Sequence, residues 1–95
     1  MTSKRTILIT GAGSGIGRGL AENLAREGHL VVVTDLDEAA AKTVADQIAE
    51  YGGEAQALGL DVASDASIAD ALTRVARPVD VLINNAGLQH VARLE

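Results

Sequence analysis

Residues 10–17 read Thr10-Gly11-Ala12-Gly13-Ser14-Gly15-Ile16-Gly17, and this glycine-rich stretch decides the fold of the chain. It follows the β-branched run Thr6–Thr10, which predicts a strand, and it precedes residues whose apolar spacing predicts a helix. A glycine-rich turn between a strand and a helix is typical of loops that hold phosphate groups. In such a loop Gly11 permits a tight turn, Gly15 lets the backbone approach a pyrophosphate, and Gly17 lets the helix pack closely against the sheet.

The glycines are spaced Gly11-x-x-x-Gly15-x-Gly17, which is not the strict G-x-G-x-x-G pattern, and the Gly-Lys-Ser/Thr of a P-loop is absent. The first turn of a helix offers unpaired N–H groups and a partial positive charge to phosphates. We therefore add Ser14 and Ile16 to the three glycines as candidate cofactor-binding residues. The alternative is a flexible turn that binds nothing.

Strands and helices alternate along the rest of the chain. Three further strands are predicted at Leu30–Asp35, Ala55–Leu60 and Val79–Ile83, and Leu30–Asp35 is apolar enough to be buried on both faces. A helix is predicted after each of the first three strands, and their starts and stops are marked by characteristic capping and helix-breaking residues. These are Ile16 and Gly28 for the first helix, Asp37 and Gly52-Gly53 for the second, and Ser64 or Asp65 and Pro78 for the third.

The inner face of each predicted helix consists of apolar residues that recur at helical spacing. They are Ile16, Leu20, Leu24, Ala21 and Ala25 in the first helix, Ala40, Val44, Ala45 and Ile48 in the second, and Ile68, Leu72, Val75 and Ala76 in the third. The resulting order β-α-β-α-β-α-β, with short connections, implies a parallel sheet with right-handed crossovers.

The predicted fold class is therefore α/β, a doubly wound parallel sheet of Rossmann type with strand order 3-2-1-4. In such a sheet ligands bind beyond the carboxyl ends of the strands, where the winding reverses. The loops Gly11–Gly17 and Asn84–Gly87 both fall at that point.

Asp35 ends the second predicted strand. A carboxylate at this position accepts hydrogen bonds from the ribose hydroxyls of an adenine dinucleotide and repels the 2′-phosphate of NADP. The next residue is Leu36 and not an arginine that would neutralise that phosphate. These residues predict NAD as the cofactor, and the alternative for Asp35 is an ordinary turn or capping carboxylate.

Asp61 and Val62 follow the third predicted strand. The Asp61 carboxylate could accept a hydrogen bond from the adenine amino group while Val62 packs on the ring. Aspartate after a strand is also common in turns, so a purely structural role stays open.

Composition narrows the class of protein. The 95 residues carry a net charge of −5, no cysteine and a single aromatic residue. An acidic chain without aromatic platforms is a poor match for nucleic acid. No apolar run is long enough for a signal peptide or a membrane span, so we expect a cytoplasmic protein with no membrane or nucleic-acid partner. Disulfides, thiolate catalysis and cysteine-based zinc sites are excluded, and no metal site is predicted.

The combination of Thr10-Gly11-x-x-x-Gly15-Ile16-Gly17, Asp35, Asp61-Val62 and Asn84-Asn85-Ala86-Gly87 resembles the classical short-chain dehydrogenase/reductase family over essentially the whole chain. The resemblance implies an NAD-dependent oxidoreductase that transfers hydride between nicotinamide and an alcohol or ketone. It also implies that Asn85, Ala86 and Gly87 contact the cofactor, while Asn84 is mostly structural.

The residues after that motif, Leu88-Gln89-His90-Val91-Ala92, are similar to those of D-3-hydroxybutyrate dehydrogenases within the family. The similarity gives Gln89 the role of binding the substrate carboxylate, and a small hydroxy or oxo acid becomes the expected substrate. Arg93 departs from the proline usual at that position. His90 has no predicted partner and is interpreted as a packed or solvated residue.

In the family a tyrosine acts as general acid and base, a lysine four residues later supports it, and a serine orients the substrate oxygen. Tyr51 is followed four residues later by Ala55, so it does not match and is interpreted as a helix end that covers apolar surface. We therefore expect residues 1–95 to be the N-terminal part of a single NAD-binding domain, without the catalytic C-terminal part and inactive alone. The full-length protein is expected to be a homo-oligomer.

Several alternatives stay open. The enzyme could be another short-chain reductase, such as a 3-oxoacyl carrier-protein reductase or a polyol dehydrogenase. The chain could also be a non-catalytic nucleotide-binding module. An S-adenosylmethionine-dependent methyltransferase is disfavoured by the glycine spacing and the Asn-Asn-Ala-Gly loop. Away from the site, His29 is interpreted as turn surface, and Arg18 and Arg26 as charges on a helix surface.

Overall fold

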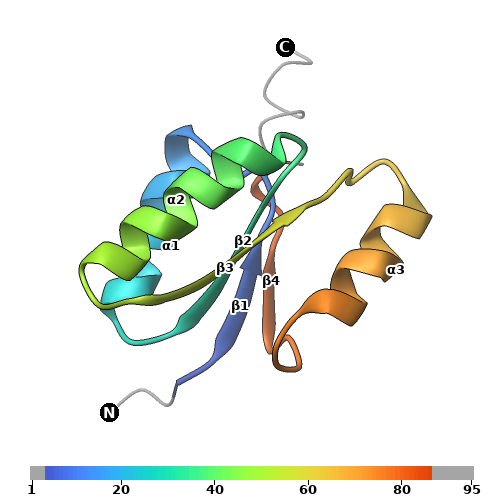
Figure 1. Ribbon diagram of the computed structural model, residues 1–95. Coiled ribbons are helices and arrows are strands. Elements are labelled where there is room, and N and C mark those ends of the chain that lie inside the picture. Colours follow the sequence, from blue (N-terminus) through green and yellow to red (C-terminus); the bar gives the residue numbers. More distant parts are fainter. Residues whose placement is uncertain (1–3, 87–95) are drawn as a thin grey trace.

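The computed structural model describes residues 4–86, which form a layered α/β structure (Figure 1). The elements in chain order are β1 (Thr6–Ile9), α1 (Gly15–Arg26), β2 (Leu30–Asp35), α2 (Glu38–Glu50), β3 (Glu54–Gly59), α3 (Asp65–Arg74) and β4 (Val81–Ile83). All strand pairs are parallel, and the order across the sheet is β3-β2-β1-β4. The predicted fold class and strand order are confirmed.

Helices cover both faces of the sheet, with α1 and α2 on one side and α3 on the other (Figure 1). Side chains of a strand alternate between the two faces. Ile7, Ile9, Val31 and Val33 accordingly pack with α1 and α2, whereas Leu8 and Val32 pack towards α3. The unbroken apolar runs of β1 and β2 are explained by this burial from both sides.

Helix α1 packs closely against the sheet through small residues. Its buried positions are Gly17, Ala21 and Ala25, whereas Leu20 and Leu24 are only partly buried. The prediction that Ile16 belongs to the inner face is wrong, because its side chain is 73% exposed. Ile16 lies in the first turn of α1, where the position facing the core is taken by Gly17.

Helix α2 follows its prediction closely. Asp37 is the N-cap, and its side chain accepts a hydrogen bond from Ala40 N at 3.2 Å. Val44, Ala45 and Ile48 are buried as predicted, whereas Ala40 is only partly buried and the buried residue of its turn is Ala41. The helix ends at Glu50, and Gly52 supports the end of the helix with a left-handed φ of 89°.

Helix α3 is shorter than predicted, because it ends at Arg74 and Val75 already has an extended backbone. Its N-cap is Ser64, which accepts from Ser67 N. The buried residue is Ala71, with Ile68 and Val75 packed beside it. Assigning Ala76 to the inner face is wrong, because it lies beyond the helix end and is exposed. Leu72 does face the sheet, where it lines an apolar cavity with Leu8, but it stays half exposed.

The edge strands also differ from the prediction. Strand β4 covers only Val81–Ile83 and is therefore shorter than predicted. The residue before it, Asp80, bonds to Thr6 at the start of β1: Asp80 N donates to Thr6 O, and Asp80 Oδ2 accepts from Thr6 N. Leu82 at this edge is largely exposed. Strand β3 begins one residue earlier than predicted and ends at Gly59.

His29 is not a surface residue, which corrects the prediction. It is 4% exposed, and its Nδ1 accepts a hydrogen bond from Arg5 N at 3.1 Å. Because β1 and β2 are neighbouring parallel strands, the residues that precede them lie side by side and enclose the imidazole.

Tyr51 and the two arginines of α1 make contacts between helices. Tyr51 is the residue after α2, its hydroxyl donates to Glu22 O, and Arg26 lies over its ring at 4.9 Å from the centroid. Arg18 pairs with Glu22 on its own helix and hydrogen-bonds Gln47 on α2. Both arginines therefore link α1 to α2, beyond the surface role that we predicted.

Candidate cofactor-binding site

The glycine loop between β1 and α1 has the backbone conformation that only glycine adopts readily. Gly11 and Gly15 have φ values of 63° and 62°, in the left-handed region. Between them the loop is held to the sheet, because Ala12 N donates to Thr34 O at 2.9 Å and the Ala12 side chain is buried. The loop therefore has a defined shape and is not a slack turn.

The structure leaves no space for a side chain at position 17. A Cβ atom on Gly17 would lie 2.4 Å from Gly11 O and 2.6 Å from Asn85 Nδ2, both closer than van der Waals contact. The start of α1 therefore rests directly on the loop and on the residues after β4, and a side chain would separate them.

The N-terminus of α1 differs from those of the other two helices. Ser14 is its N-cap residue but makes no side-chain capping hydrogen bond, whereas Asp37 and Ser64 cap α2 and α3. Ser14, Gly15 and Ile16 are all exposed. The N–H groups of a first helical turn have no partner within the helix, so this turn is open to an anion.

Asp35 ends β2 beside the glycine loop. Its Oδ2 accepts a hydrogen bond from Gly13 N at 3.0 Å, and its Oδ1 accepts one from Asp37 N at 3.0 Å. The carboxylate is half buried. The structure thus joins Asp35 to the glycine loop, two features that the sequence predicted separately. The contact is made through Gly13, a residue to which the sequence analysis assigned no role.

Asp61 and Val62 lie at the same edge of the sheet, because Leu60 N donates to Asp35 O and so holds the chain after β3 beside the end of β2. Asp61 Oδ1 accepts from Ala63 N at 3.0 Å, which is the turn role left open by the sequence. Val62 is 44% exposed. A role of either residue towards adenine stays a prediction.

The residues after β4 are bonded to the start of the glycine loop through Thr10. Its hydroxyl donates to Asn84 Oδ1 at 2.9 Å and accepts from Ala86 N at 3.1 Å. The partner of the Asn85 side chain is Gly11 O, at 3.1 Å from Nδ2. These bonds connect positions more than 70 residues apart in the chain, and sequence reasoning assigned no such role to Thr10.

Asn85 is 2% exposed, so its side chain supports the loop from within the protein. A cofactor contact by Asn85 or Ala86 stays a prediction. The predicted residues Gly87, Gln89 and His90 lie outside the described residues.

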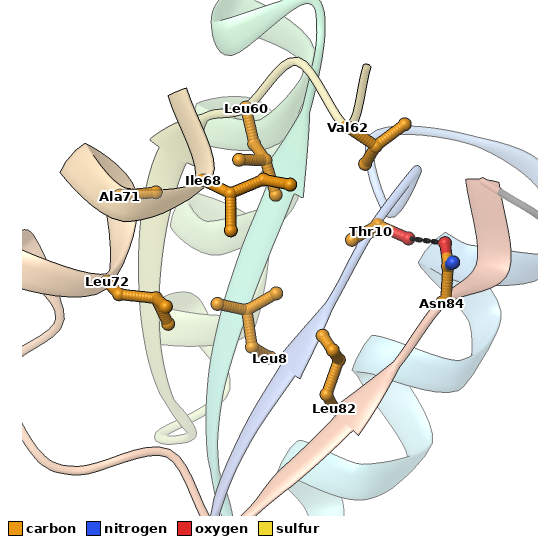
Figure 2. Close-up of a pocket in the computed structure, with 9 residues that line it drawn as sticks. All are labelled: Leu8, Thr10, Leu60, Val62, Ile68, Ala71, Leu72, Leu82 and Asn84. Carbon is orange, nitrogen blue, oxygen red and sulfur yellow. Dashed lines mark hydrogen bonds between the residues drawn. The ribbon is translucent and has the colours of Figure 1, made fainter. Parts of the chain in front are cut away.

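An apolar cavity of about 150 Å³ lies under this edge, between α3 and the sheet (Figure 2). Leu8, Leu60 and Ile68 are among its apolar walls, and Val62, Thr10 and Asn84 also line it. Figure 2 shows the Thr10–Asn84 hydrogen bond on the side where β1 and β4 end. The cavity thus adjoins the polar residues that support the glycine loop.

Within residues 4–86 no cluster of three or more His, Cys, Asp or Glu side chains could hold a metal ion. A perturbed carboxyl lies elsewhere: the hydrogen bond and charge of Lys4 lower the pKa of Glu54 below its ordinary value. Glu54 begins β3, at the opposite end of the sheet from the glycine loop. Among the described helices, none has the length and apolarity to cross a membrane.

Four parallel strands in order 3-2-1-4, with helices on both faces and a glycine loop where the winding reverses, define a Rossmann-like α/β protein. Residues 5–95 match the family model described as short chain dehydrogenase. The chain therefore belongs to the short-chain dehydrogenase family, as the sequence motifs predicted.

Similar proteins support this assignment. The uncharacterized oxidoreductase YxjF of Bacillus subtilis (strain 168) is 42% identical over 95 residues, which are 97% of this chain and 37% of that protein. The crystal structure of hydroxysteroid dehydrogenase from Escherichia coli is 37% identical, with a TM-score of 0.76, over 84% of this chain and 35% of that one.

A structure from Beutenbergia cavernae, provisionally named an NAD(P)-dependent gluconate 5-dehydrogenase, contains NADP at low occupancy. It is 43% identical with a TM-score of 0.71, over 82% of this chain and 32% of that one. The chain thus spans about a third of the length of each of these three proteins. None of the three is described as acting on 3-hydroxybutyrate, so that substrate stays a prediction.

Proposed function

We propose that the chain binds NAD and forms the N-terminal part of a single dinucleotide-binding domain in a short-chain dehydrogenase. The observation that carries the proposal is the contact between the Asp35 carboxylate and the glycine loop, at 3.0 Å from Gly13 N. It brings a ribose acceptor and a phosphate cradle together at the carboxyl edge of the sheet, where such folds bind dinucleotides.

The loop fits the pyrophosphate of a dinucleotide. Gly11 and Gly15 have left-handed backbone conformations, which turn the chain tightly between the end of β1 and the first turn of α1. The exposed first turn of α1, which has no side-chain cap, supplies N–H groups and the positive end of the helix dipole. These groups would bind the phosphates without any cationic side chain.

Asp35 supports NAD over NADP. A carboxylate accepts up to about four hydrogen bonds, and two are used by Gly13 N and Asp37 N, which leaves one acceptor site per oxygen for ribose hydroxyls. A 2′-phosphate would place negative charge next to this carboxylate. Two unit charges 4 Å apart repel by about 1 kcal/mol in water and about 4 kcal/mol at an effective dielectric constant near 20. We expect a preference of at least about fivefold for NAD.

On the adenine side, exposed Val62 offers an apolar surface, and the Asp61 carboxylate lies next to it in sequence after β3. We assign the adenine ring to this part of the edge. Ala86 and Gly87 are assigned to the same cofactor by the family resemblance.

When bound, the nicotinamide ring accepts or supplies a hydride, and the family's serine, tyrosine and lysine handle the proton. The 95 residues contain no Tyr-x-x-x-Lys pair. Positioned proton transfer is typically worth about a hundred- to ten-thousand-fold in rate. We therefore propose that these residues bind the dinucleotide but do not turn over an alcohol or ketone by themselves.

For the whole enzyme we propose a small hydroxy acid as substrate, with 3-hydroxybutyrate as the example and Gln89 as the donor to its carboxylate. The test is NAD reduction by D-3-hydroxybutyrate and by polyols, in a protein that contains these residues together with the family's Ser, Tyr and Lys. Loss of activity towards the hydroxy acid in Gln89→Ala is the expected result. Turnover of polyols alone would reject the assignment.

The cofactor proposal is tested by calorimetric titration of the chain with NAD and, separately, with NADP. We expect NAD to bind more tightly, and Asp35→Asn to bring the two dissociation constants close together. Asp46→Asn, an exposed carboxylate on α2, is the matched control and should leave the preference unchanged. A chain that is folded by circular dichroism but binds NADP more tightly, or binds neither, would contradict the proposal.

A further inference from the structure

Gly13 donates to Asp35, but the dinucleotide proposal does not explain why this position is a glycine. Its φ does not lie in the left-handed region, which within the described chain holds only Gly11, Gly15, Gly28 and Gly52. The φ angle of Gly13 therefore does not require a glycine. The reason for glycine at this position must be sought in its surroundings.

The surroundings leave no room for a side chain. A Cβ atom on Gly13 would lie 2.8 Å from the Ala40 Cβ and 2.9 Å from Asp35 Oδ2. By contrast, a Cβ atom on Gly19 in the same region of the chain would meet nothing within 4 Å. Gly13 is thus confined between helix α2 and the carboxylate that the proposed function assigns to the ribose.

The two neighbours differ in how easily they can move. Ala40 belongs to the first turns of α2, and its backbone N–H is held by the cap residue Asp37 at 3.2 Å. Moving Ala40 would therefore require moving the start of the helix. The Asp35 carboxylate lies at the end of a side chain, so a Cβ atom at position 13 would displace it and weaken its 3.0 Å bond to Gly13 N.

We propose that Gly13 is a specificity-determining positioning residue for the dinucleotide. Its N–H holds one carboxylate oxygen of Asp35 while Asp37 N holds the other, and its missing side chain leaves the carboxylate in that place. The inference rests on the proposed function, since it concerns how Asp35 discriminates NAD from NADP. Gly13 itself acts only through Asp35.

A purely structural role of Gly13 makes a different prediction. If Gly13 served only to let the loop pack, a side chain there would weaken the binding of NAD and of NADP in the same proportion, because both contain the pyrophosphate. Displacement of the carboxylate instead removes a favourable contact with NAD and a repulsion from NADP. The ratio of the two dissociation constants therefore separates the two roles.

The experiment compares Gly13→Ala with the matched control Gly19→Ala by calorimetric titration with NAD and with NADP. We expect the ratio of dissociation constants, NADP over NAD, to fall by up to about fivefold in Gly13→Ala, equivalent to about 1 kcal/mol, and to stay unchanged in Gly19→Ala. The double variant Gly13→Ala/Ala40→Gly removes the closest obstructing atom and should recover part of the ratio.

If wild type prefers NAD and Gly13→Ala keeps that ratio, the inference is overturned while the proposed function stands. If wild type binds neither dinucleotide, both fail. If Gly13→Ala does not fold, nuclear magnetic resonance of the wild-type chain and of Asp35→Asn tests whether Gly13 N holds the Asp35 carboxylate. The Gly13 amide proton should shift upfield when Asp35→Asn removes its charged acceptor, and the Gly19 amide should not. An unchanged Gly13 signal would overturn the inference.

Discussion

The sharpest test of the loop geometry is the pair Gly17→Ala and Gly19→Ala, which makes the same change at two positions of helix α1. At Gly19 an added Cβ meets nothing within 4 Å. Alanine is favoured over glycine inside helices by about 0.8–1.0 kcal/mol, so Gly19→Ala should raise the free energy of unfolding by roughly that amount.

At Gly17 the same methyl group would lie 2.4 Å from Gly11 O and 2.6 Å from Asn85 Nδ2. Forcing an extra methyl into a packed site typically costs about 1–3 kcal/mol. If the Asn85–Gly11 bond breaks, the buried Asn85 amide also loses its partner, which costs about 1–3 kcal/mol more. After the gain in helix propensity, we expect Gly17→Ala to lower the free energy of unfolding by about 1–5 kcal/mol.

The assay is urea unfolding followed by far-ultraviolet circular dichroism, with both variants and wild type in the same buffer. A loss of this size is a large share of the 5–15 kcal/mol typical of small domains, so the midpoint should move clearly. Equal stability of Gly17→Ala and Gly19→Ala would refute the conclusion that α1 rests on the glycine loop.

Three further predictions concern contacts away from Gly17. Asn85→Ala should lower the free energy of unfolding by about 1–3 kcal/mol, measured by urea unfolding, because it leaves the Gly11 carbonyl without its 3.1 Å partner; a neutral effect would argue against that bond. Thr10→Val should also lower the free energy of unfolding by about 1–3 kcal/mol, since it removes a hydroxyl that both donates and accepts a hydrogen bond. The control is Thr43→Val at an exposed position of α2, which should change the free energy of unfolding little. Lys4 lowers the pKa of Glu54 from 4.5, so the pair stabilises the fold at higher pH, and this contribution is lost as the pH falls through the lowered pKa. Lys4→Gln should therefore make the decline of the urea midpoint between pH 7 and pH 3 slightly shallower. An unchanged decline would show that the pair does not form in solution.

The sequence by itself determined the order of elements, the strand order and the family. These follow from local signals: apolar spacing, capping residues such as Asp37 and Ser64, and glycines at turns. Once strands and helices alternate, right-handed crossovers leave few possible arrangements of the sheet. The motif residues near the strand ends then meet at one edge, because parallel strands end on the same side.

Tertiary structure alone decided which side chains were buried and which partners they found. Ile16 fits the helical pattern but is exposed because α1 begins beyond the core, and His29 is buried because two neighbouring strands begin together. The bond from Asn85 to Gly11 joins residues 74 positions apart, and the confinement of Gly13 depends on where α2 lies. Such contacts depend on strand register and helix placement over the whole chain, which local sequence patterns do not encode.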